Sequence, residues 1–407
     1  MKIVLVSYYF SPLNSPASTR LFSFAKYLAE YGNQVTVVTR KWSGDFVVDE
    51  SGFDVIRIAS GSQGSGMSAQ SNYPVRVKSI LRNLGASELL KLIPLKHHPR
   101  DEIRWLRLAR NAVDDLVDAG RCEILVTSHP VSEVIKLGAY AKRRYGDLIK
   151  WVIDYRDLFS NNHMVDYYWW VRRLLRVYER VLTRGADGAV YASEGIRKDS
   201  VLYRSIPTDV VFNGYLDDPQ QRRSDKSKVR SGQILYAGSL YGGLRDIETF
   251  VKVLKRRSDL TMVAAFFDEA DSHYFNGLIK KFRIDPRRVS VRLGVPRNEI
   301  RMLEDESEYL LICLRKDGRD KAYPTAKLFD YLYAGKYIIG VGSSESEAAR
   351  IVQKTHGGVF AVSVEDIEGA LYNREKPIVD RNELKQFDRA VQAAHLLTFC
   401  KQVLLTV

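Results

Sequence analysis

The sequence has few cysteines, and this scarcity excludes several kinds of site. Among 407 residues there are three, at Cys122, Cys313 and Cys400, and they are scattered along the chain. This spacing fits neither a disulfide framework nor a zinc-binding motif. We therefore expect each thiol to be a small core residue in a reducing compartment, and we expect no metal site.

Long apolar runs are also missing. No segment reaches the roughly 20 apolar residues that a membrane-spanning helix needs. The opening run Ile3–Phe10 is too short for a signal peptide and lacks a small-residue cleavage site. These absences predict a cytoplasmic protein, and they leave open a peripheral contact with the inner face of the cytoplasmic membrane.

Acidic residues are outnumbered by basic ones, 49 to 62, which gives a net charge of +13. A content of 45% hydrophobic and 27% charged residues is typical of a globular protein. The positive charge favours polyanionic partners, namely nucleotide phosphates, an anionic membrane, acidic glycans or nucleic acid. Nucleic acid is the weakest of these interpretations, because the basic residues are dispersed among acidic ones and no recognition module is present.

Short apolar runs alternate with segments of helical periodicity along the whole chain, a pattern typical of parallel α/β sheets. A chain of 407 residues is also longer than one hydrophobic core usually supports, so we expect two domains. The predicted strands are Ile3–Val6, Val35–Val38, Val55–Ile58, Ile124–Thr127, Trp151–Ile153, Ala189–Tyr191 and Val210–Phe212, then Ile234–Ala237, Met262–Phe267, Val289–Leu293, Tyr309–Leu314 and Ile338–Val341.

A segment with almost no apolar residues, 217–232, predicts a linker between the domains. The first domain is then 1–216 and the second 233–382. The remaining residues, 383–407, form one predicted helix. It packs either on the second domain or back on the first.

Two further segments have two interpretations each. The glycine- and serine-rich stretch 61–71 is either a lid or a plain loop. In the predicted helix 166–184, five arginines share an arc of roughly 120° opposite an apolar side. This helix either docks on anionic lipid, with Tyr167–Trp170 near the interface, or packs on its own sheet with a solvated basic face. We favour the second interpretation, because apolar stripes usually face cores.

The stretch 321–342 combines a proline turn, a short helix, a glycine stop and an apolar strand. Pro324 and Thr325 indicate where the helix begins, and Thr325 can accept a hydrogen bond from its free amides. Lys327 and Asp330 share one face of this helix, which suits a phosphate linked to a hydroxyl-rich sugar. An ordinary solvated ion pair explains the same spacing. The glycine-rich turn 238–243, followed by Arg245, is a second candidate phosphate site.

Seven motifs, taken in order, resemble those of the retaining family-four glycosyltransferases of GT-B fold. They are TSHP at 127–130, WVIDYRDLF at 151–159, ADGAVYASEG at 186–195, FNGYLDD at 212–218, LYAGSLYGG at 235–243, LGVPRNEI at 293–300 and YPTAKLFDYLYAGKYIIG at 323–340. The resemblance implies two Rossmann-like domains facing across a cleft. It also implies transfer of a hexose-type sugar from a nucleotide diphosphate donor to a glycan or lipid-linked glycan, without a metal or cofactor.

The resemblance also assigns residues to roles. On the donor side it implies Gly238, Ser239, Arg245, Thr325 and Lys327 for the diphosphate, Asp330 for the ribose, and Gly294 and Val295 for the base. In the catalytic cleft it implies Asp154, Arg156 and Asp157. On the acceptor side we place Ser15, Arg20 and His129; Arg20 follows the loop after the first strand and could meet an anion there, although we favour a solvated helix charge. An alternative for 154–157 is a structural network of arginine and carboxylates.

The sequence departs from the family pattern in three places. Ala322 replaces an acidic residue that contacts the donor sugar in the family, and Ser239 replaces an arginine. The segment 11–18 replaces a double-glycine loop. Two other functions therefore stay open: a nucleotide-sugar-binding homologue without activity, and a nucleotide-sugar epimerase on the same fold.

Overall fold

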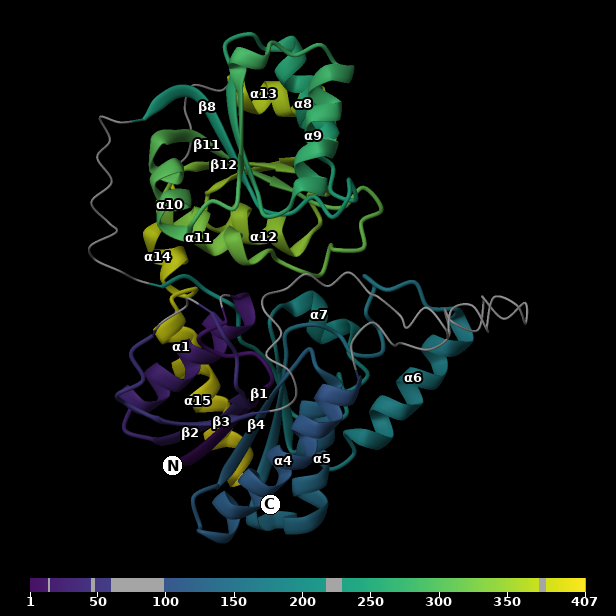
Figure 1. The fold of residues 1–407 in the computed structure, drawn as a ribbon, viewed down its shortest axis with the longest axis vertical. Helices are drawn as coiled ribbons and strands as arrows, with labels where there is room; N and C mark the ends of the chain where they lie inside the picture. Colours follow the sequence, from purple (N-terminus) through teal and green to yellow (C-terminus); the bar gives the residue numbers. More distant parts are fainter. Residues whose placement is uncertain (14, 45–47, 60–98, 217–228, 373–377, 407) are drawn as a thin grey trace. The chain divides into compact units, whose positions relative to one another are not determined.

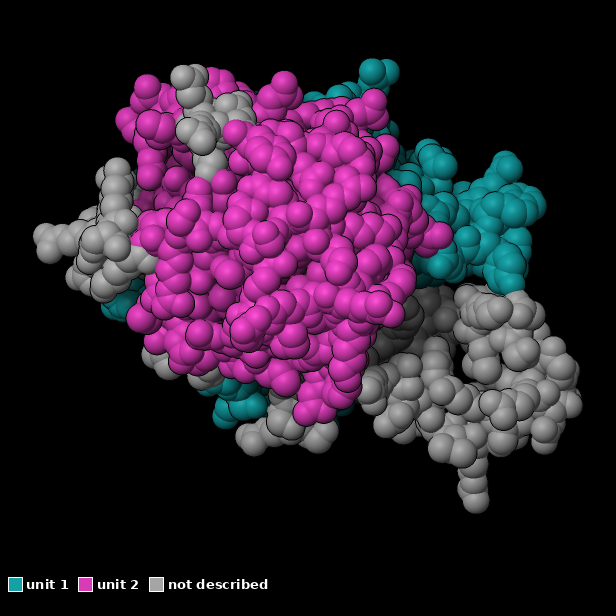
Figure 2. Space-filling model, turned by 90° about the horizontal axis from the view of Figure 1, so that it is seen from above, with its two compact units in different colours: residues 1–212, 392–407 teal, residues 213–391 magenta. Residues whose placement is uncertain are grey.

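A computed structural model describes residues 1–13, 15–44, 48–59, 99–216, 229–372 and 378–406 (Figure 1). The chain forms two compact units. Unit 1 consists of Met1–Phe212 and Gln392–Val407, and unit 2 of Asn213–Val391; Figure 2 shows unit 1 in teal and unit 2 in magenta. The stretch 61–71 and most of the predicted linker, 217–228, lie outside the described residues.

Unit 1 is built on a sheet of seven parallel strands in the order β3-β2-β1-β4-β5-β6-β7. The strands are β1 (Lys2–Ser7), β2 (Gln34–Arg40), β3 (Asp54–Ile58), β4 (Ile124–His129), β5 (Lys150–Tyr155), β6 (Gly188–Tyr191) and β7 (Thr208–Val210). The helices are α1 (Pro16–Glu30), α4 (Pro99–Asp118), α5 (Ser132–Tyr145), η1 (Gly146–Leu148), α6 (Trp169–Leu182), α7 (Glu194–Asp199) and α15 (Arg389–Leu405).

Unit 2 repeats this plan with six parallel strands in the order β10-β9-β8-β11-β12-β13. The strands are β8 (Arg230–Ala237), β9 (Thr261–Phe266), β10 (Val289–Leu293), β11 (Ser307–Cys313), β12 (Tyr337–Val341) and β13 (Gly358–Ala361). The helices are α8 (Ile247–Arg256), α9 (Glu269–Lys281), η3 (Pro286–Arg288), α10 (Arg297–Glu306), α11 (Ala326–Ala334), α12 (Glu347–Lys354), α13 (Val364–Tyr372) and α14 (Arg381–Lys385).

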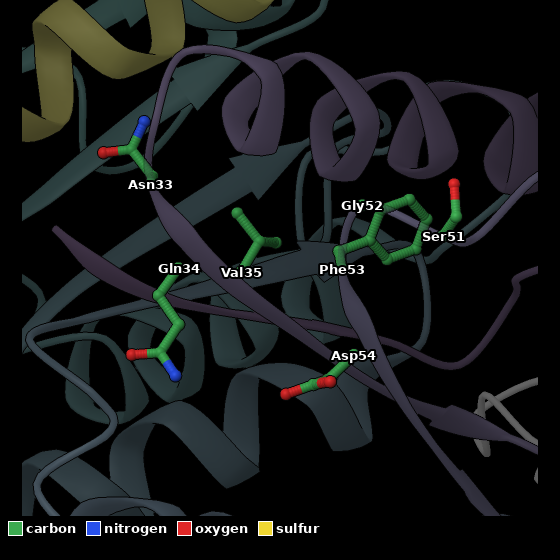
Figure 3. Close-up of a pocket in the computed structure, with 7 residues that line it drawn as sticks. All are labelled: Asn33, Gln34, Val35, Ser51, Gly52, Phe53 and Asp54. Atoms are coloured by element: carbon green, nitrogen blue, oxygen red, sulfur yellow. The ribbon is translucent and has the colours of Figure 1, made fainter.

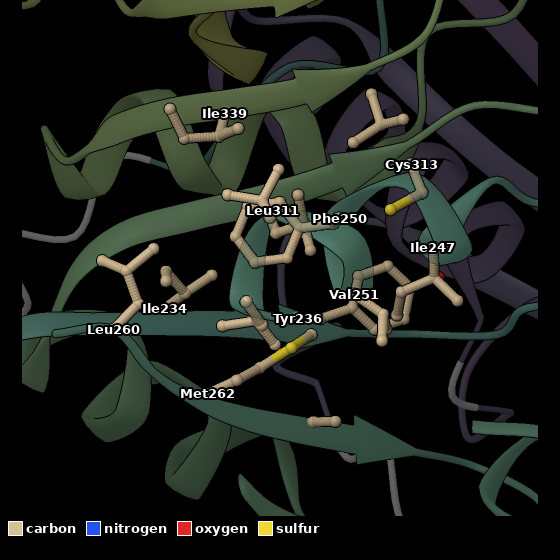
Figure 4. Close-up of a cluster of buried hydrophobic side chains, with 14 of the residues drawn as sticks. Ile234, Tyr236, Ile247, Phe250, Val251, Leu260, Met262, Leu311, Cys313 and Ile339 are labelled. Atoms are coloured by element: carbon tan, nitrogen blue, oxygen red, sulfur yellow. The ribbon is translucent and has the colours of Figure 1, made fainter. Parts of the chain in front are cut away.

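Each sheet has its own apolar core, as expected of parallel strands covered by helices on both faces. In unit 2, side chains of the central strands pack against α8; among them are Tyr236, Phe250 and Leu311 (Figure 4). In unit 1 the core includes residues of α15, so the last sixteen residues belong to the first sheet: Ala393, Leu396, Leu397, Phe399, Cys400 and Val403. All three cysteines are buried with free thiols, as predicted.

The strand order reverses beside the first strand of each sheet, between β1 and β4 in unit 1 and between β8 and β11 in unit 2. In parallel α/β sheets, the loops at the carboxyl ends of strands next to such a reversal form the usual ligand site. The two loops concerned in unit 2 begin at Gly238 and at Leu314. Both lead into segments that the sequence analysis singled out.

The structure corrects three details of the predicted elements. β8 begins at Arg230, inside the predicted linker, because its exposed first residues extend beyond the core and still pair with Ser307 of β11. β13 was not anticipated. The single helix expected over 383–405 is two helices, because the residues between them pair with Tyr215: Tyr215 N donates to Phe387 O, and Arg389 N to Tyr215 O.

Candidate functional site

Lys327 of α11 lies against the end of β8 in unit 2. Its Nζ donates to Ala237 O at 2.9 Å and lies 4.2 Å from the centre of the Tyr236 ring. Gly238 continues the chain with φ of +135°, a conformation that side chains disfavour. A Cβ at this glycine would stand 3.2 Å from Lys327 Nζ. The glycine therefore gives the ammonium group room beside the turn.

No carboxylate forms an ion pair with Lys327 among the described residues. Burial, and then repulsion from Arg245, lower the pKa of Lys327 to about 7. Arg245 itself keeps a buried Nε without a hydrogen-bond partner and stacks on Tyr241. Two neighbouring cations at the rim of a sheet repel each other, so an anion bound between them would offset this repulsion and stabilise both charged forms.

The start of α11 leaves a polar atom without a partner. Thr325 is the N-cap residue, but its side chain makes no capping hydrogen bond, contrary to expectation. Leu328 N, the amide that it would cap, is bonded to the carbonyl of Thr325 at 3.0 Å. The buried Oγ1 of Thr325 therefore has no hydrogen-bond partner among the residues that the structure describes. Together with the helix N-terminus, this hydroxyl suits a bound anion.

Asp330 lies one turn further along α11. Its Oδ2 is 3.4 Å from Arg297 Nη2 of α10, and each side chain is about one third exposed. The carboxylate is thus held in place and still accessible. The turn before α10 contains Gly294 and Val295; Gly294 has φ of +61°, and nothing lies within 4 Å of the position where its Cβ would be. This turn offers open backbone to a ligand.

Several polar groups of the glycine-rich turn in unit 2 are hydrogen-bonded within the protein. Asp271 of α9 accepts hydrogen bonds from Ser239 Oγ at 2.6 Å, from Leu240 N at 2.6 Å and from Gly242 N at 2.9 Å. A carboxylate of the protein therefore occupies amides that we expected a phosphate to approach. The capacity to bind an anion at this rim lies with the side chains of Arg245, Thr325 and Lys327.

Unit 1 holds a buried ion pair on the rim of its sheet. Arg20 of α1 donates two hydrogen bonds to Asp154 at the end of β5, from Nη2 to Oδ1 at 2.7 Å and from Nε to Oδ2 at 3.2 Å. Both side chains are almost fully buried. Ser128 Oγ donates to the same carboxylate at 2.8 Å. Arg20 also donates to Phe212 O at 2.9 Å. Since its partners are all internal, this network orders the rim.

The other residues of this rim have different environments. His129 is buried, and its Nδ1 is 2.9 Å from Asp157 O; since a carbonyl only accepts, Nδ1 carries the proton. Burial lowers the pKa of His129 to about 4, so the ring is neutral near pH 7. Arg156 Nη2 and Asp157 Oδ2 lie 3.9 Å apart. Burial lowers the pKa of Arg156 and raises that of Asp157. Ser15 caps α1 by accepting from Ser18 N.

Aromatic side chains after β1 and β2 were not anticipated as part of the rim. Tyr9 stacks on Trp42, with ring centres 5.7 Å apart, and Arg40 lies over the Trp42 ring at 4.4 Å. The Trp42 ring is thus in contact with both a stacked tyrosine and a guanidinium group. No sequence motif identified them, because the two rings come from different loops.

Two carboxyl groups face each other on the same side of unit 1. Burial, and then repulsion from Glu133 of α5, raise the pKa of Glu102 in α4 to about 8. Although burial acts the other way, a hydrogen bond from Lys136 at 2.9 Å lowers the pKa of Glu133. At pH 7, therefore, Glu102 holds a proton and Glu133 does not. This pairing joins two consecutive helices, α4 and α5, and has no sequence signal.

A hollow of about 290 Å³ lies at the opposite edge of the unit 1 sheet (Figure 3). It is lined by Asn33, Gln34, Val35, Ser51, Gly52, Phe53 and Asp54. These residues lie at the amino-terminal ends of β2 and β3. The hollow is therefore not part of the rim described above.

The described ranges of the chain contain no cluster of three or more His, Cys, Asp or Glu side chains that could hold a metal ion. Over the same ranges, no helix combines the length and apolarity needed to cross a bilayer.

No protein-family model matches the sequence, and no curated protein matches it. Solved structures do resemble it over the full length. Sucrose-phosphate synthase from Thermosynechococcus elongatus has a TM-score of 0.67 and 13% identity, covering 100% of this chain and 99% of that chain. Anabaena HepE, solved with UDP and glucose, has a TM-score of 0.64 and 13% identity, covering 98% and 99%.

The same fold occurs in an epimerase. A putative UDP-N-acetylglucosamine 2-epimerase from Listeria monocytogenes has a TM-score of 0.52 and 9% identity, covering 100% of this chain and 97% of that chain. At these identities the similarity concerns the fold. Two parallel sheets of seven and six strands match the GT-B structures, so the predicted fold class is confirmed.

Proposed function

We propose that this protein is a retaining glycosyltransferase that moves a hexose-type sugar from a nucleotide diphosphate sugar to a glycan or lipid-linked glycan. The observation that carries the proposal is the set of unpartnered groups at the rim of the unit 2 sheet, from the turn before α8 and the start of α11. Within the described part of the chain, Lys327 has no carboxylate partner, and Arg245 Nε and Thr325 Oγ1 are buried without a hydrogen bond. A diphosphate supplies the negative charge and acceptor oxygens that these groups lack.

In this proposal the chemistry is metal-independent. Charge builds up on the diphosphate as the glycosidic bond breaks, and Arg245 and Lys327 stabilise it as fixed positive groups. The N-terminus of α11 adds its partial positive charge. Asp330, held by Arg297, accepts hydrogen bonds from the ribose hydroxyls. The open backbone turn at Gly294 and Val295 contacts the nucleotide base.

On the acceptor side we assign unit 1. Arg156, Asp157 and neutral His129 are the groups of its rim that contact the acceptor or the transferred sugar. Arg20 and Asp154 are fully engaged with each other, so we assign them a positioning role, together with Ser15, which caps α1.

The test is a thermal-shift screen of UDP-, GDP- and ADP-linked hexoses, followed by turnover with the sugar that stabilises the protein. Ligand at about 100 times its dissociation constant should add about 2.7 kcal/mol of stability, which raises Tm by several degrees. With an acceptor present, NMR of the product should show the anomeric configuration of the donor. Binding without turnover on any acceptor would identify an inactive homologue, and no binding would refute the donor site.

The epimerase is the second candidate, favoured by the shared fold of the Listeria protein. An epimerase acts on the donor alone. Incubation with the sugar nucleotide and no acceptor would then yield an epimerised sugar nucleotide. A transferase yields no epimer under these conditions and releases nucleotide diphosphate when the acceptor is added.

A further inference from the structure

Helix α6 exposes the apolar side that we expected to face the core. Leu174, Val177 and Val181 are 61%, 52% and 69% exposed, and Trp169 and Trp170 at the start of the helix are exposed as well. Of the predicted apolar side, Val171 is buried and Leu175 and Leu182 are partly buried, whereas Leu174, Tyr178 and Val181 are exposed. The interpretation that the whole side packs on the sheet of unit 1 is therefore wrong. A row of large apolar side chains along one helix is a recognised mark of an interaction surface.

The inner side of α6 explains why the apolar row faces outward. Glu179 is buried, and it accepts hydrogen bonds from Tyr155 Oη at 2.9 Å, from Ser160 N at 3.1 Å and from Ser160 Oγ. Val171 is buried on the same side. A buried carboxylate that lost these donors would be costly, so this contact fixes the rotation of the helix. Figure 1 shows α6 on the outer side of unit 1, beyond α5.

A basic row accompanies the apolar one. At 100° per residue, Trp170, Leu174, Val177 and Val181 fall within roughly 60° of one another, and the exposed Arg173, Arg176, Arg180 and Arg184 lie on the adjoining arc. The acidic residue of α6, Glu179, is buried on the third side. The outward surface of the helix is therefore apolar and cationic, with no carboxylate of its own.

We propose that α6 docks unit 1 on the surface of an anionic lipid bilayer. A helix lying in the interface inserts its apolar side among the acyl chains while its arginines meet the headgroup phosphates, and tryptophan and tyrosine favour the boundary between the two. The exposed Trp169, Trp170 and Tyr178 occupy such positions. A second copy of the chain fits less well, because pairing two α6 surfaces would place arginine rows against each other. The proposal does not depend on the reaction catalysed.

Flotation with vesicles tests this docking. The intact protein should float with vesicles of phosphatidylcholine and phosphatidylglycerol, and only weakly with phosphatidylcholine alone. Each arginine near an anionic surface contributes about fivefold to partitioning, so Arg173→Gln, Arg176→Gln and Arg180→Gln combined should reduce it roughly a hundredfold. A second variant, Leu174→Ser with Val177→Ser and Val181→Ser, should lose binding even at low salt. Both should keep the wild-type Tm, because the changed side chains are exposed.

The matched control removes the same charge elsewhere in unit 1. Arg104, Arg107 and Arg143 are exposed on α4 and α5, and their triple change to glutamine should leave flotation unaltered. Failure of the intact protein to float with anionic vesicles would overturn the proposal. So would an equal loss in the control variant, which would show that net charge alone is responsible. A dimer in sedimentation velocity that Leu174→Ser dissociates would assign the face to a second copy, and protection of α6 by residues 60–98 in cross-linking would assign it to this chain.

Discussion

Two buried or half-buried charged residues at the rims of the sheets have opposite environments. Asp154 has Arg20 and Ser128 as partners inside the protein. Lys327 has a carbonyl, an aromatic face and a second cation near it. The carboxylate of Asp154 is already neutralised by a cation inside the protein. The ammonium form of Lys327 is destabilised by its surroundings, and an anionic ligand would stabilise it. On this difference rest our assignment of a structural role to Asp154 and our proposal of a binding role for Lys327.

The depressed pKa of Lys327 predicts a pH-dependent affinity for the donor. A bound diphosphate favours the ammonium form, so binding raises this pKa above its free value of about 7. Affinity is then highest below pH 7 and falls by up to tenfold per unit as pH rises above it. A nucleotide sugar is the right ligand, since its diphosphate diester does not titrate in this range.

Isothermal calorimetry from pH 6 to 9 measures the profile just described. Lys327→Met should flatten it and weaken binding at pH 6. Glu304 of α10 also titrates in this pH range. Burial, and then repulsion from Asp330, raise its pKa to about 8. If the lysine variant kept the slope and Glu304→Gln removed it, Glu304 would be the group responsible and our assignment to Lys327 would be wrong.

Asp154→Ala should act on stability. It leaves the buried guanidinium of Arg20 without its counter-ion, which costs about 3–5 kcal/mol. The double variant Asp154→Leu with Arg20→Met should recover most of this loss, because no buried charge remains. Urea unfolding measures both variants. A single variant within about 0.5 kcal/mol of wild type would show that the ion pair is not structural.

At the scale of elements, local rules predicted the described strands other than β13 and most helices, because period-two and period-3.6 patterns depend on neighbouring residues. They failed where a distant contact decides. The outward rotation of α6 depends on Glu179 meeting Tyr155 and Ser160, and the break before α15 depends on pairing with Tyr215. The side-chain row of α6 was visible in the sequence, but its direction was not.

The candidate site shows the same limit. The helix that carries Lys327 and Asp330 was predictable, since a proline turn followed by a helix start is a local signal. The role of Asp271, which occupies the amides of the glycine-rich turn, depends on residues about thirty positions away. The pairing of Arg20 with Asp154 spans 134 positions. Sequence periodicity carries no information about such pairs.

Asp271→Ala should destabilise unit 2 through the turn. It leaves the amides of Leu240 and Gly242 and the hydroxyl of Ser239 without their acceptor, at a cost of about 2–3 kcal/mol. Asp259→Ala is the control: this exposed carboxylate pairs with Arg257, and its loss should cost less than about 1 kcal/mol. Equal denaturation midpoints for the two variants would contradict this account of the turn.

At the scale of the whole molecule, the chain passes from unit 1 to unit 2 and back again. It leaves unit 1 after Phe212 and returns within α15, so that residues 392–407 complete the first core. The sequence left the destination of this segment open, because its apolar residues suit either sheet. Unit 1 therefore needs the C-terminus of the chain for its stability.

Leu396→Ala should lower the stability of unit 1 by about 2–5 kcal/mol, because it leaves a cavity in that core. In hydrogen exchange, the amides of β1 and β5 should lose protection while those of β8 and β11 keep theirs. Leu311→Ala, in the core of unit 2, should give the reverse pattern. Equal losses in both units from either change would show that the two cores do not unfold separately.

The central claim is that the rim of unit 2 beside α11 binds a nucleotide diphosphate, and calorimetric titration of nucleotide diphosphate sugars tests it directly. Lys327→Met should weaken binding by roughly 10- to 100-fold, the worth of one charge-assisted hydrogen bond. Lys354→Met removes an exposed lysine at the end of α12 in the same unit and should leave affinity unchanged. Equal affinity for wild type, Lys327→Met and Lys354→Met, or no binding by wild type, would contradict the account.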